Sequence, residues 1–143
     1  MSNIQKVLMT GKTQTTPSDA GGNLNIHLTA PGNSAVPEHV FAAIQPHPTA
    51  EQLFAGAWSA CYISAVALVA KEGKVVLPAE TSVDIEVDLG MTGSEYLLQA
   101  RINLHVPGID QEVATAIAHA AHQICPYSKA TRGNIDVVLR AIS

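Results

Sequence analysis

The sequence predicts an α+β protein, and the prediction rests on the order of its segments and on its short length. The segments expected as strands are residues 4–10, 23–29, 83–89, 96–106 and 135–142. Most of them alternate apolar and polar residues, as a strand with one buried face does. Two helical segments, 49–72 and 110–124, lie between these strands, an order typical of α+β domains. The 143 residues, 1–143, are expected to form one domain.

Local signals set the limits of these elements. Residues 11–22, rich in Gly, Thr and Ser, are expected to connect the first two strands. Residues 30–48 hold four of the eight prolines and predict a long loop, and loops of this length are usually functional or mobile. Gly90 to Ser94 is expected to turn the chain between the two central strands, which then form an antiparallel hairpin. Asp110 is a suitable N-cap for the second helix, and Pro126 should end it.

The composition excludes several classes of protein. Hydrophobic residues make up 47% and charged residues only 14%, against about 25% charged residues in ordinary domains. This excludes intrinsic disorder and suggests that one face is hidden in an oligomer, because charge is depleted at interface cores. The net charge is −4, and the eight Lys and Arg residues form no basic run. We therefore expect no nucleic-acid partner.

The segment from Leu53 to Ala70 contains no charged residue and could in principle cross a membrane. Alanine dominates it, small residues are interspersed, and no basic flank would orient it, so we interpret it as a buried central helix with no membrane partner. Thr49 and Gln52 form a capping-box pattern at its start. Residues 1–6 have no apolar core typical of a signal peptide, and two cysteines are too few for a disulfide scaffold. A cytoplasmic location is expected.

Taken alone, the two cysteines do not establish a site. Cys61 and Cys125 are 64 residues apart in the sequence, and each could be a small buried apolar residue. His119, His122 and Cys125 follow at steps of three, but such steps drift about 60° each around a helix, so we favour solvent or interface histidines over a metal site. Ser59 lacks the glycines of a nucleophile elbow, which argues against serine chemistry.

The residues around both cysteines are more informative. The stretch from Ala50 to Gly56 leads into Ser59-Ala60-Cys61, and the longer motif Cys-Pro-Tyr-Ser-Lys-Ala-Thr-Arg-Gly-Asn-Ile-Asp-Val covers residues 125–137. Together they resemble the organic hydroperoxide resistance (Ohr) proteins of the OsmC/Ohr family, over about residues 49–143. The resemblance implies curved antiparallel β-sheets wrapped around central helices, in an intertwined homodimer with its active sites at the interface.

The resemblance also implies a reaction. Family members reduce alkyl or fatty-acid hydroperoxides to alcohols with thiols, and a dithiol, typically a dihydrolipoyl group on a lipoylated protein, restores them. No metal, haem or flavin cofactor is implied. Cys61 matches the peroxidatic cysteine, which becomes a sulfenic acid, and Cys125 matches the resolving cysteine, which forms the disulfide. Glu51 matches the glutamate that holds an arginine beside the thiolate, although it could instead complement the helix dipole.

Two further expectations concern the shape of this site. The apolar residues expected to line a substrate pocket are Leu53, Phe54, Ile63 and Val66. Ten residues separate Glu51 from Cys61, which is about 15 Å along an unbroken helix. For both side chains to serve one site the helix must bend, and we predict a break near Gly56.

The sequence departs from the family pattern at the arginine. The family carries this residue in its N-terminal hairpin, whereas here the matching stretch reads Thr10-Gly11-Lys12-Thr13-Gln14, and no arginine precedes Arg101. A buried thiolate needs a positive neighbour, and Lys12 and Arg132 are the candidate cations. The missing arginine also leaves open a non-catalytic protein that binds a lipid-like ligand in the same pocket, or a structural dimer with inert thiols.

Overall fold

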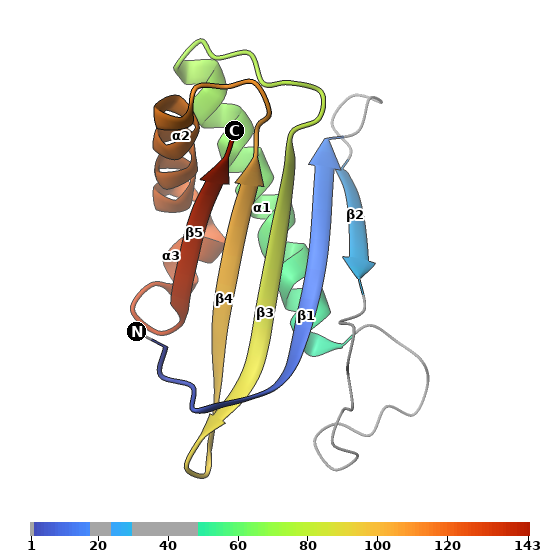
Figure 1. Cartoon of the computed structure of the whole chain (residues 1–143), viewed down its shortest axis with the longest axis vertical. Helices are drawn as coiled ribbons and strands as arrows, with labels where there is room; N and C mark the ends of the chain where they lie inside the picture. Colours follow the sequence, from blue (N-terminus) through green and yellow to red (C-terminus); the bar gives the residue numbers. More distant parts are fainter. Residues whose placement is uncertain (1, 18–23, 30–48) are drawn as a thin grey trace.

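The fold is built on one twisted sheet of five strands (Figure 1). The computed structural model describes residues 2–17, 24–29 and 49–143. The strands lie in the order β2-β1-β3-β4-β5, and their bounds are Lys6–Pro17 for β1, Leu24–Thr29 for β2, Ser82–Thr92 for β3, Glu95–His105 for β4 and Asp136–Ile142 for β5. All neighbours are antiparallel except β4 and β5, which run parallel.

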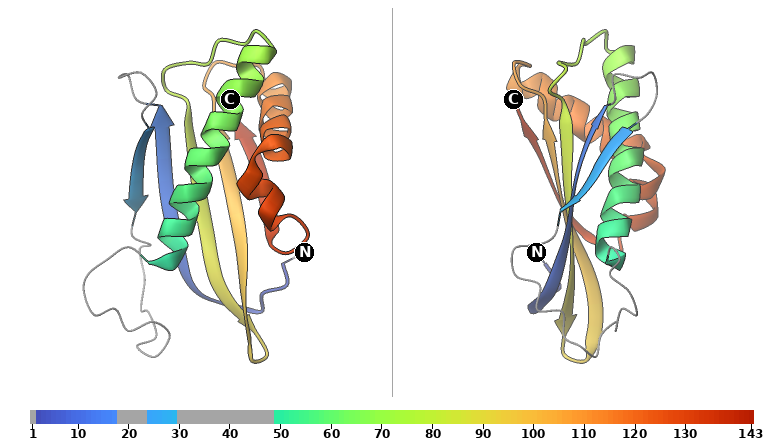
Figure 2. Two further views of the ribbon diagram at one scale, coloured as in Figure 1. Left: turned by 180° about the vertical axis from the view of Figure 1, so that it is seen from behind. Right: turned by 90° about the vertical axis from the view of Figure 1, so that its right-hand side faces the viewer.

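Three helices cover one face of this sheet (Figure 2). They are α1 (Ala50–Glu72), α2 (Gln111–Ile124) and α3 (Pro126–Thr131). The capping box of Thr49 and Gln52 starts α1, and Asp110 caps α2 by accepting hydrogen bonds from two backbone amides. The connection from β4 through α2 and α3 returns the chain to the same edge of the sheet, which is why β5 lies parallel to β4.

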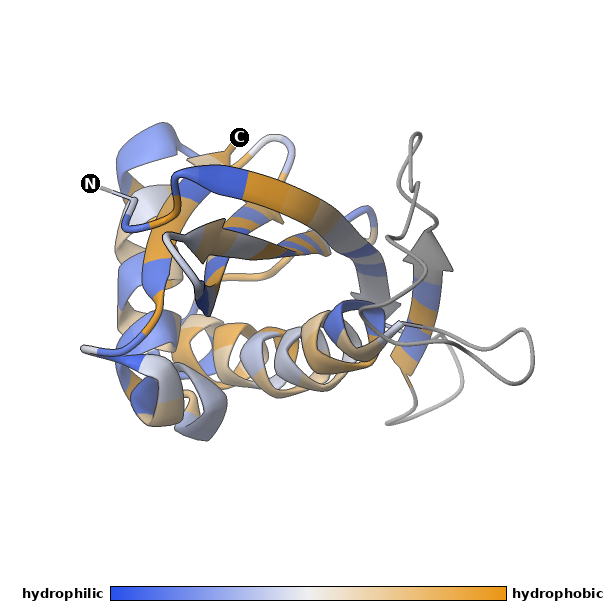
Figure 3. Ribbon diagram, turned by 90° about the horizontal axis from the view of Figure 1, so that it is seen from below, coloured by the Kyte–Doolittle hydropathy of each residue, from blue (hydrophilic) through white to orange (hydrophobic). Residues whose placement is uncertain are grey.

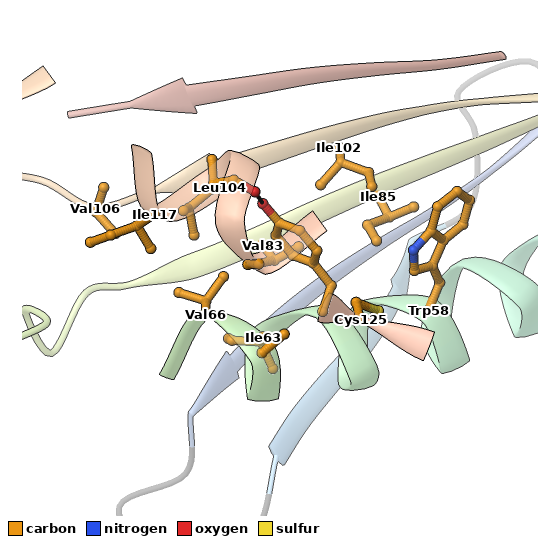
Figure 4. Packing of buried hydrophobic residues seen from close by; sticks show 14 of the residues in the cluster. Trp58, Ile63, Val66, Val83, Ile85, Ile102, Leu104, Val106, Ile117 and Cys125 are labelled. Atoms are coloured by element: carbon orange, nitrogen blue, oxygen red, sulfur yellow. Dashed lines mark hydrogen bonds between the residues drawn. The ribbon is translucent and has the colours of Figure 1, made fainter. Parts of the chain in front are cut away.

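The core lies between the sheet and α1, with α2 closing one side. Trp58, Tyr62 and Val66 of α1 are fully buried against the inward residues of the two central strands. On β3 these are Val83, Ile85 and Val87, and on β4 they are Ala100, Ile102 and Leu104. Figure 4 shows Trp58, Ile63, Val66 and Cys125 among these side chains. On the strands the buried residues are two positions apart, and on α1 they are four positions apart. These are the spacings that place side chains on one face of a strand or a helix.

The opposite face of the sheet carries a charged network. Arg101 on β4 makes a bidentate pair with Asp88 at 2.7 and 2.8 Å and reaches Glu86 at 2.6 Å. Lys12 on β1 also approaches Glu86, at 3.4 Å. This face of the sheet therefore carries a cluster of paired charged side chains.

Most of the predicted architecture is confirmed. The α+β class, the central hairpin and both long helices are present, whereas α3 was not expected and β5 makes the sheet mixed rather than antiparallel. The predicted loop over residues 30–48 lies outside the described residues. Within the described part of the chain α1 is the one helix long and apolar enough to cross a bilayer (Figure 3). Half of its apolar window is buried inside the protein.

The predicted break near Gly56 is wrong. α1 runs without interruption from Ala50 to Glu72, and Gly56 is buried within it. A glycine costs a helix only about 1 kcal/mol relative to alanine. The strong N-cap and the burial of one side of the helix against the sheet outweigh that cost, so the sequence spacing did not require a bend.

Candidate active site

Two free thiols meet where α1 passes the junction of α2 and α3. The Sγ atoms of Cys61 and Cys125 lie 2.8 Å apart, although 64 residues separate them in the sequence. A disulfide has an S–S distance of about 2.05 Å, so a movement below about 1 Å would join them. Cys61 is partly exposed on α1, whereas Cys125 is fully buried. Only Cys61 therefore offers its sulfur to a molecule arriving from solvent.

Pro126 places Cys125 at this junction. A residue before proline is restricted to extended backbone, and Cys125 has φ −60° and ψ 121°. It therefore ends α2 and also serves as the N-cap residue of α3, which begins at Pro126. The resulting elbow turns the Cys125 side chain inward, toward α1.

The surroundings of Cys61 favour the protonated thiol. Its pKa is raised from 9.0 to about 11, chiefly by burial, and Cys125 raises it further as a hydrogen-bonding neighbour. The backbone amide of Tyr127 acts in the opposite direction by hydrogen bonding to the sulfur. None of these causes is a cationic side chain. The nucleophilic thiolate is consequently a minor species at neutral pH.

Glu51 lies in the first turn of α1, ten residues before Cys61 on the uninterrupted helix. It is 5% exposed and lies under Gly11 of β1, where an added Cβ would come within 2.5 Å of the Glu51 carbonyl carbon. The ion pairs found among the described residues do not include its carboxylate. The structure therefore brings Glu51 to β1, the strand that should carry the family arginine, and the ion pairs of the described residues leave its carboxylate out.

The two candidate cations are engaged elsewhere. Gly11 faces α1, so the next residue, Lys12, points to the opposite face of the sheet and pairs there with Glu86. Arg132 donates a hydrogen bond to the carbonyl of His122 at the end of α2. All eight lysines and arginines of the sequence lie in described segments. The expectation that Lys12 stands beside the thiolate is therefore not met within one chain.

The four apolar residues expected to line one pocket separate into two groups. Ile63 and Val66 point into the core and are at most 3% exposed. Leu53 is 55% exposed on the other side of α1, and Phe54 packs edge-on against Trp58 with ring centroids 5.7 Å apart. Ile63 and Val66 therefore do not share one surface with the exposed Leu53, because residues of a helix face different sides according to their position in its 3.6-residue turn.

The histidines of α2 form no metal centre with their neighbours. Across residues 2–17, 24–29 and 49–143, no group of three or more His, Cys, Asp or Glu side chains is placed to hold a metal ion. Burial lowers the pKa of His122, and Arg132 and His119 lower it further. These surroundings therefore favour the neutral imidazole of His122.

Comparison with known proteins agrees with this geometry. The family profile described as "OsmC-like protein" matches residues 43–140. The chain belongs to the OsmC-like family. Over 139 residues it is 34% identical to an organic hydroperoxide resistance protein of Xanthomonas axonopodis pv. citri, covering 97% of this chain and 98% of that protein.

Solved structures of OsmC-like proteins have the same fold. An organic hydroperoxide resistance protein of Legionella pneumophila matches with a TM-score of 0.67 and 30% identity, over 92% of this chain and 96% of that one. One from Elizabethkingia anophelis matches with a TM-score of 0.66 and 31% identity, over 98% and 99% of the two chains. The OsmC/Ohr resemblance of the sequence is thus confirmed, and with it the fold.

Sequence reasoning missed several side chains around the two cysteines of this OsmC-like protein. Trp58, Tyr62 and Ser128 are all fully buried and join α1 to the elbow at Cys125. Ser128 lies inside the quoted C-terminal motif, and Trp58 and Tyr62 flank Cys61, so their positions were available. Their partners were not, because hydrogen bonds between segments depend on how the helices pack.

Proposed function

We propose that this protein reduces organic hydroperoxides to alcohols through a Cys61–Cys125 disulfide. The observation that carries the proposal is the 2.8 Å approach of the two thiols. The organic hydroperoxide resistance proteins to which the chain is similar support the substrate class. The unequal exposure of the cysteines supports their order, because the partly exposed Cys61 can meet a peroxide and the buried Cys125 can only follow.

The chemistry proceeds in three balanced steps. The Cys61 thiolate attacks the distal peroxide oxygen, the O–O bond breaks, and the released alkoxide takes a proton to become the alcohol. Cys61 is then a sulfenic acid. The Cys125 thiol attacks its sulfur, forming the S–S bond and releasing water. An external dithiol such as dihydrolipoamide reduces the disulfide by two exchange reactions and is itself oxidised to the cyclic disulfide. No cofactor takes part in these steps.

The functional unit in this proposal is a homodimer in the cytoplasm. α1 leaves an uncharged strip of its outer face exposed, with Leu53 and Leu68 about half exposed and Ala57, Ser64 and Ala67 between them. A second copy would cover this strip beside Cys61. The reducing cytoplasm would return both cysteines to the thiol state.

A steady-state peroxidase assay tests the proposal. Purified protein is given cumene or fatty-acid hydroperoxide with dihydrolipoamide, and separately hydrogen peroxide. We expect turnover of the organic peroxides, complete loss of activity in Cys61→Ser, and a single oxidation without recycling in Cys125→Ser. Glu72→Gln, a change at the exposed C-terminal end of the same helix and eleven residues from Cys61, serves as the matched control. Steady-state turnover in Cys61→Ser would contradict the proposal.

The lack of an arginine before Arg101 favours one second candidate, a non-catalytic protein that binds a lipid-like ligand. The same preparation discriminates between the two. Saturable binding of a fatty acid, with no peroxide consumption by protein whose thiols are fully reduced at the start, would support the binding protein. Peroxide consumption that depends on Cys61 would exclude it.

A further inference from the structure

Two buried aromatic residues flank Cys61. Each is hydrogen-bonded to one of the two helices, α2 and α3, that meet at Cys125. Trp58 Nε1 donates to Ser128 Oγ of α3 at 3.0 Å. The Tyr62 hydroxyl donates to the carbonyl oxygen of Ala118 in α2 at 2.9 Å. Trp58, Tyr62 and Ser128 have no exposed surface. Water therefore cannot replace either hydrogen bond without opening the core.

The two hydrogen bonds hold different sides of the α2–α3 junction at Cys125. Tyr62 fixes α2 two turns before Cys125, where α2 already packs along α1 and β5. Trp58 fixes α3, a helix of six residues that begins directly after Cys125. Ser128 is only three residues from Cys125, and Trp58 is three residues from Cys61. The Trp58–Ser128 bond thus ties the segment that follows Cys125 to the helix that carries Cys61, at three residues from each cysteine.

We propose that Trp58 and Ser128 form a positioning pair that keeps the Cys125 thiol beside Cys61 and so favours disulfide closure over further oxidation. The inference rests on the proposed thiol chemistry. A Cys61 sulfenic acid has two fates. Attack by the Cys125 thiol gives the disulfide and water, whereas a second hydroperoxide oxidises it to a sulfinic acid and leaves as the alcohol.

The position of Cys125 decides between these fates. An intramolecular attack gains its speed from held geometry, and a displacement of about 1 Å reduces that gain strongly. The second oxidation depends only on peroxide and is insensitive to α3. The pair therefore controls the ratio of disulfide to sulfinic acid, whatever the rate of the first oxidation.

Ser128→Ala removes the acceptor with the smallest change in volume, and Trp58→Phe removes the donor while keeping an aromatic ring. Ser59→Ala is the matched control. Ser59 lies on the same helix, is equally buried, and makes a hydrogen bond of 2.7 Å to Thr15 of β1, away from the elbow. A general loss of stability would affect all three variants alike.

Reduced protein is mixed with increasing cumene hydroperoxide, and peptide mass spectrometry gives the disulfide and sulfinic fractions of Cys61. We expect the peroxide concentration that over-oxidises half of Cys61 to fall at least tenfold in Ser128→Ala and Trp58→Phe, and to stay within twofold of wild type in Ser59→Ala. An unchanged half-point in Ser128→Ala would overturn the proposal, as would an equal fall in Ser59→Ala.

A peroxide-free measurement keeps this test separate from the proposed function. Glutathione disulfide converts Cys61 to a mixed disulfide, and Cys125 then displaces glutathione to close the Cys61–Cys125 bond. We expect the effective concentration of the Cys125 thiol to fall at least tenfold in Ser128→Ala relative to wild type and Ser59→Ala. If the effective concentration falls in this way but the protein does not react with peroxide, the positioning role of Trp58 and Ser128 stands and only the proposed peroxidase activity is rejected. No fall would reject the pair itself.

Discussion

The pH dependence of Cys61 reactivity follows directly from the surroundings of its sulfur. Burial and the adjacent Cys125 raise its pKa from 9.0 to about 11. An ordinary cysteine with a pKa of 9.0 is about 1% thiolate at pH 7, whereas a group with a pKa of 11 is about 0.01% thiolate. Raising the pH from 7 to 9 should therefore increase the reaction rate of Cys61 about 100-fold, because only the thiolate reacts and the pKa lies above both values.

Alkylation by iodoacetamide measures this rate without any assumption about the natural substrate. Reduced protein is sampled between pH 6 and 10, and the Cys61 and Cys125 peptides are quantified separately by mass spectrometry. N-acetylcysteine serves as the reference thiol. The buried Cys125 should react more slowly than Cys61 at every pH. A Cys61 rate that reaches a plateau below pH 8 would refute the reasoning and show that a cation stabilises the thiolate.

Lys12 provides a control for the same experiment. Its side chain pairs with Glu86 on the face of the sheet that points away from α1. We expect Lys12→Gln to leave the alkylation profile of Cys61 unchanged. A profile shifted to higher pH in this variant would assign Lys12 the activating role that the missing family arginine leaves vacant.

Two further predictions concern stability. Gly11→Ala should lower the free energy of unfolding by about 1–3 kcal/mol, because the added Cβ would lie 2.4 Å from the backbone nitrogen of Gln52. Gly73→Ala should change the free energy of unfolding little, because its added Cβ would lie 3.4 Å from the nearest atom. Equal denaturation midpoints for the two variants would contradict this prediction. Arg101→Gln should cost about 2 kcal/mol at pH 7 by removing charged hydrogen bonds to Asp88. Burial alone would raise the pKa of Asp88, but the bonds from Arg101, Gln99 and Thr10 outweigh it and hold that pKa below its usual 3.8. The stabilisation is therefore present above pH 3.8 and is lost as the pH falls through the lower folded-state value, so the stabilities of the variant and wild type should converge in acid; a constant difference from pH 7 to pH 2 would contradict the assignment.

Local patterns were sufficient to predict most of the fold. The alternation over residues 83–89 predicted β3, and the Thr49–Gln52 capping box placed the start of α1 to within a residue. The parallel direction of β5 was not predictable from local patterns, because alternation is the same in parallel and antiparallel strands. The six-residue helix α3 was missed for a similar reason, since so short a segment carries no periodic signal.

In the candidate site, too, the features set by local motifs were predicted and those set by the packing of distant segments were not. The motifs around Cys61 and Cys125 identified the two sulfurs that the fold brings to 2.8 Å. The break near Gly56 was inferred from a role that Glu51 has in relatives, and the uninterrupted α1 does not provide the geometry that this role would need within one chain. The direction in which Lys12 points depended on the register of β1 against β3, which residue types alone do not fix.

The central claim is that an organic hydroperoxide joins Cys61 to Cys125. The most direct test is the mass of the reduced protein after one equivalent of cumene hydroperoxide, followed by non-reducing peptide mapping. We expect the loss of two hydrogen atoms per chain and one linked peptide that contains Cys61 and Cys125. Two free thiols after the reaction, or a Cys61 that gains oxygen while Cys125 stays unlinked, would contradict it.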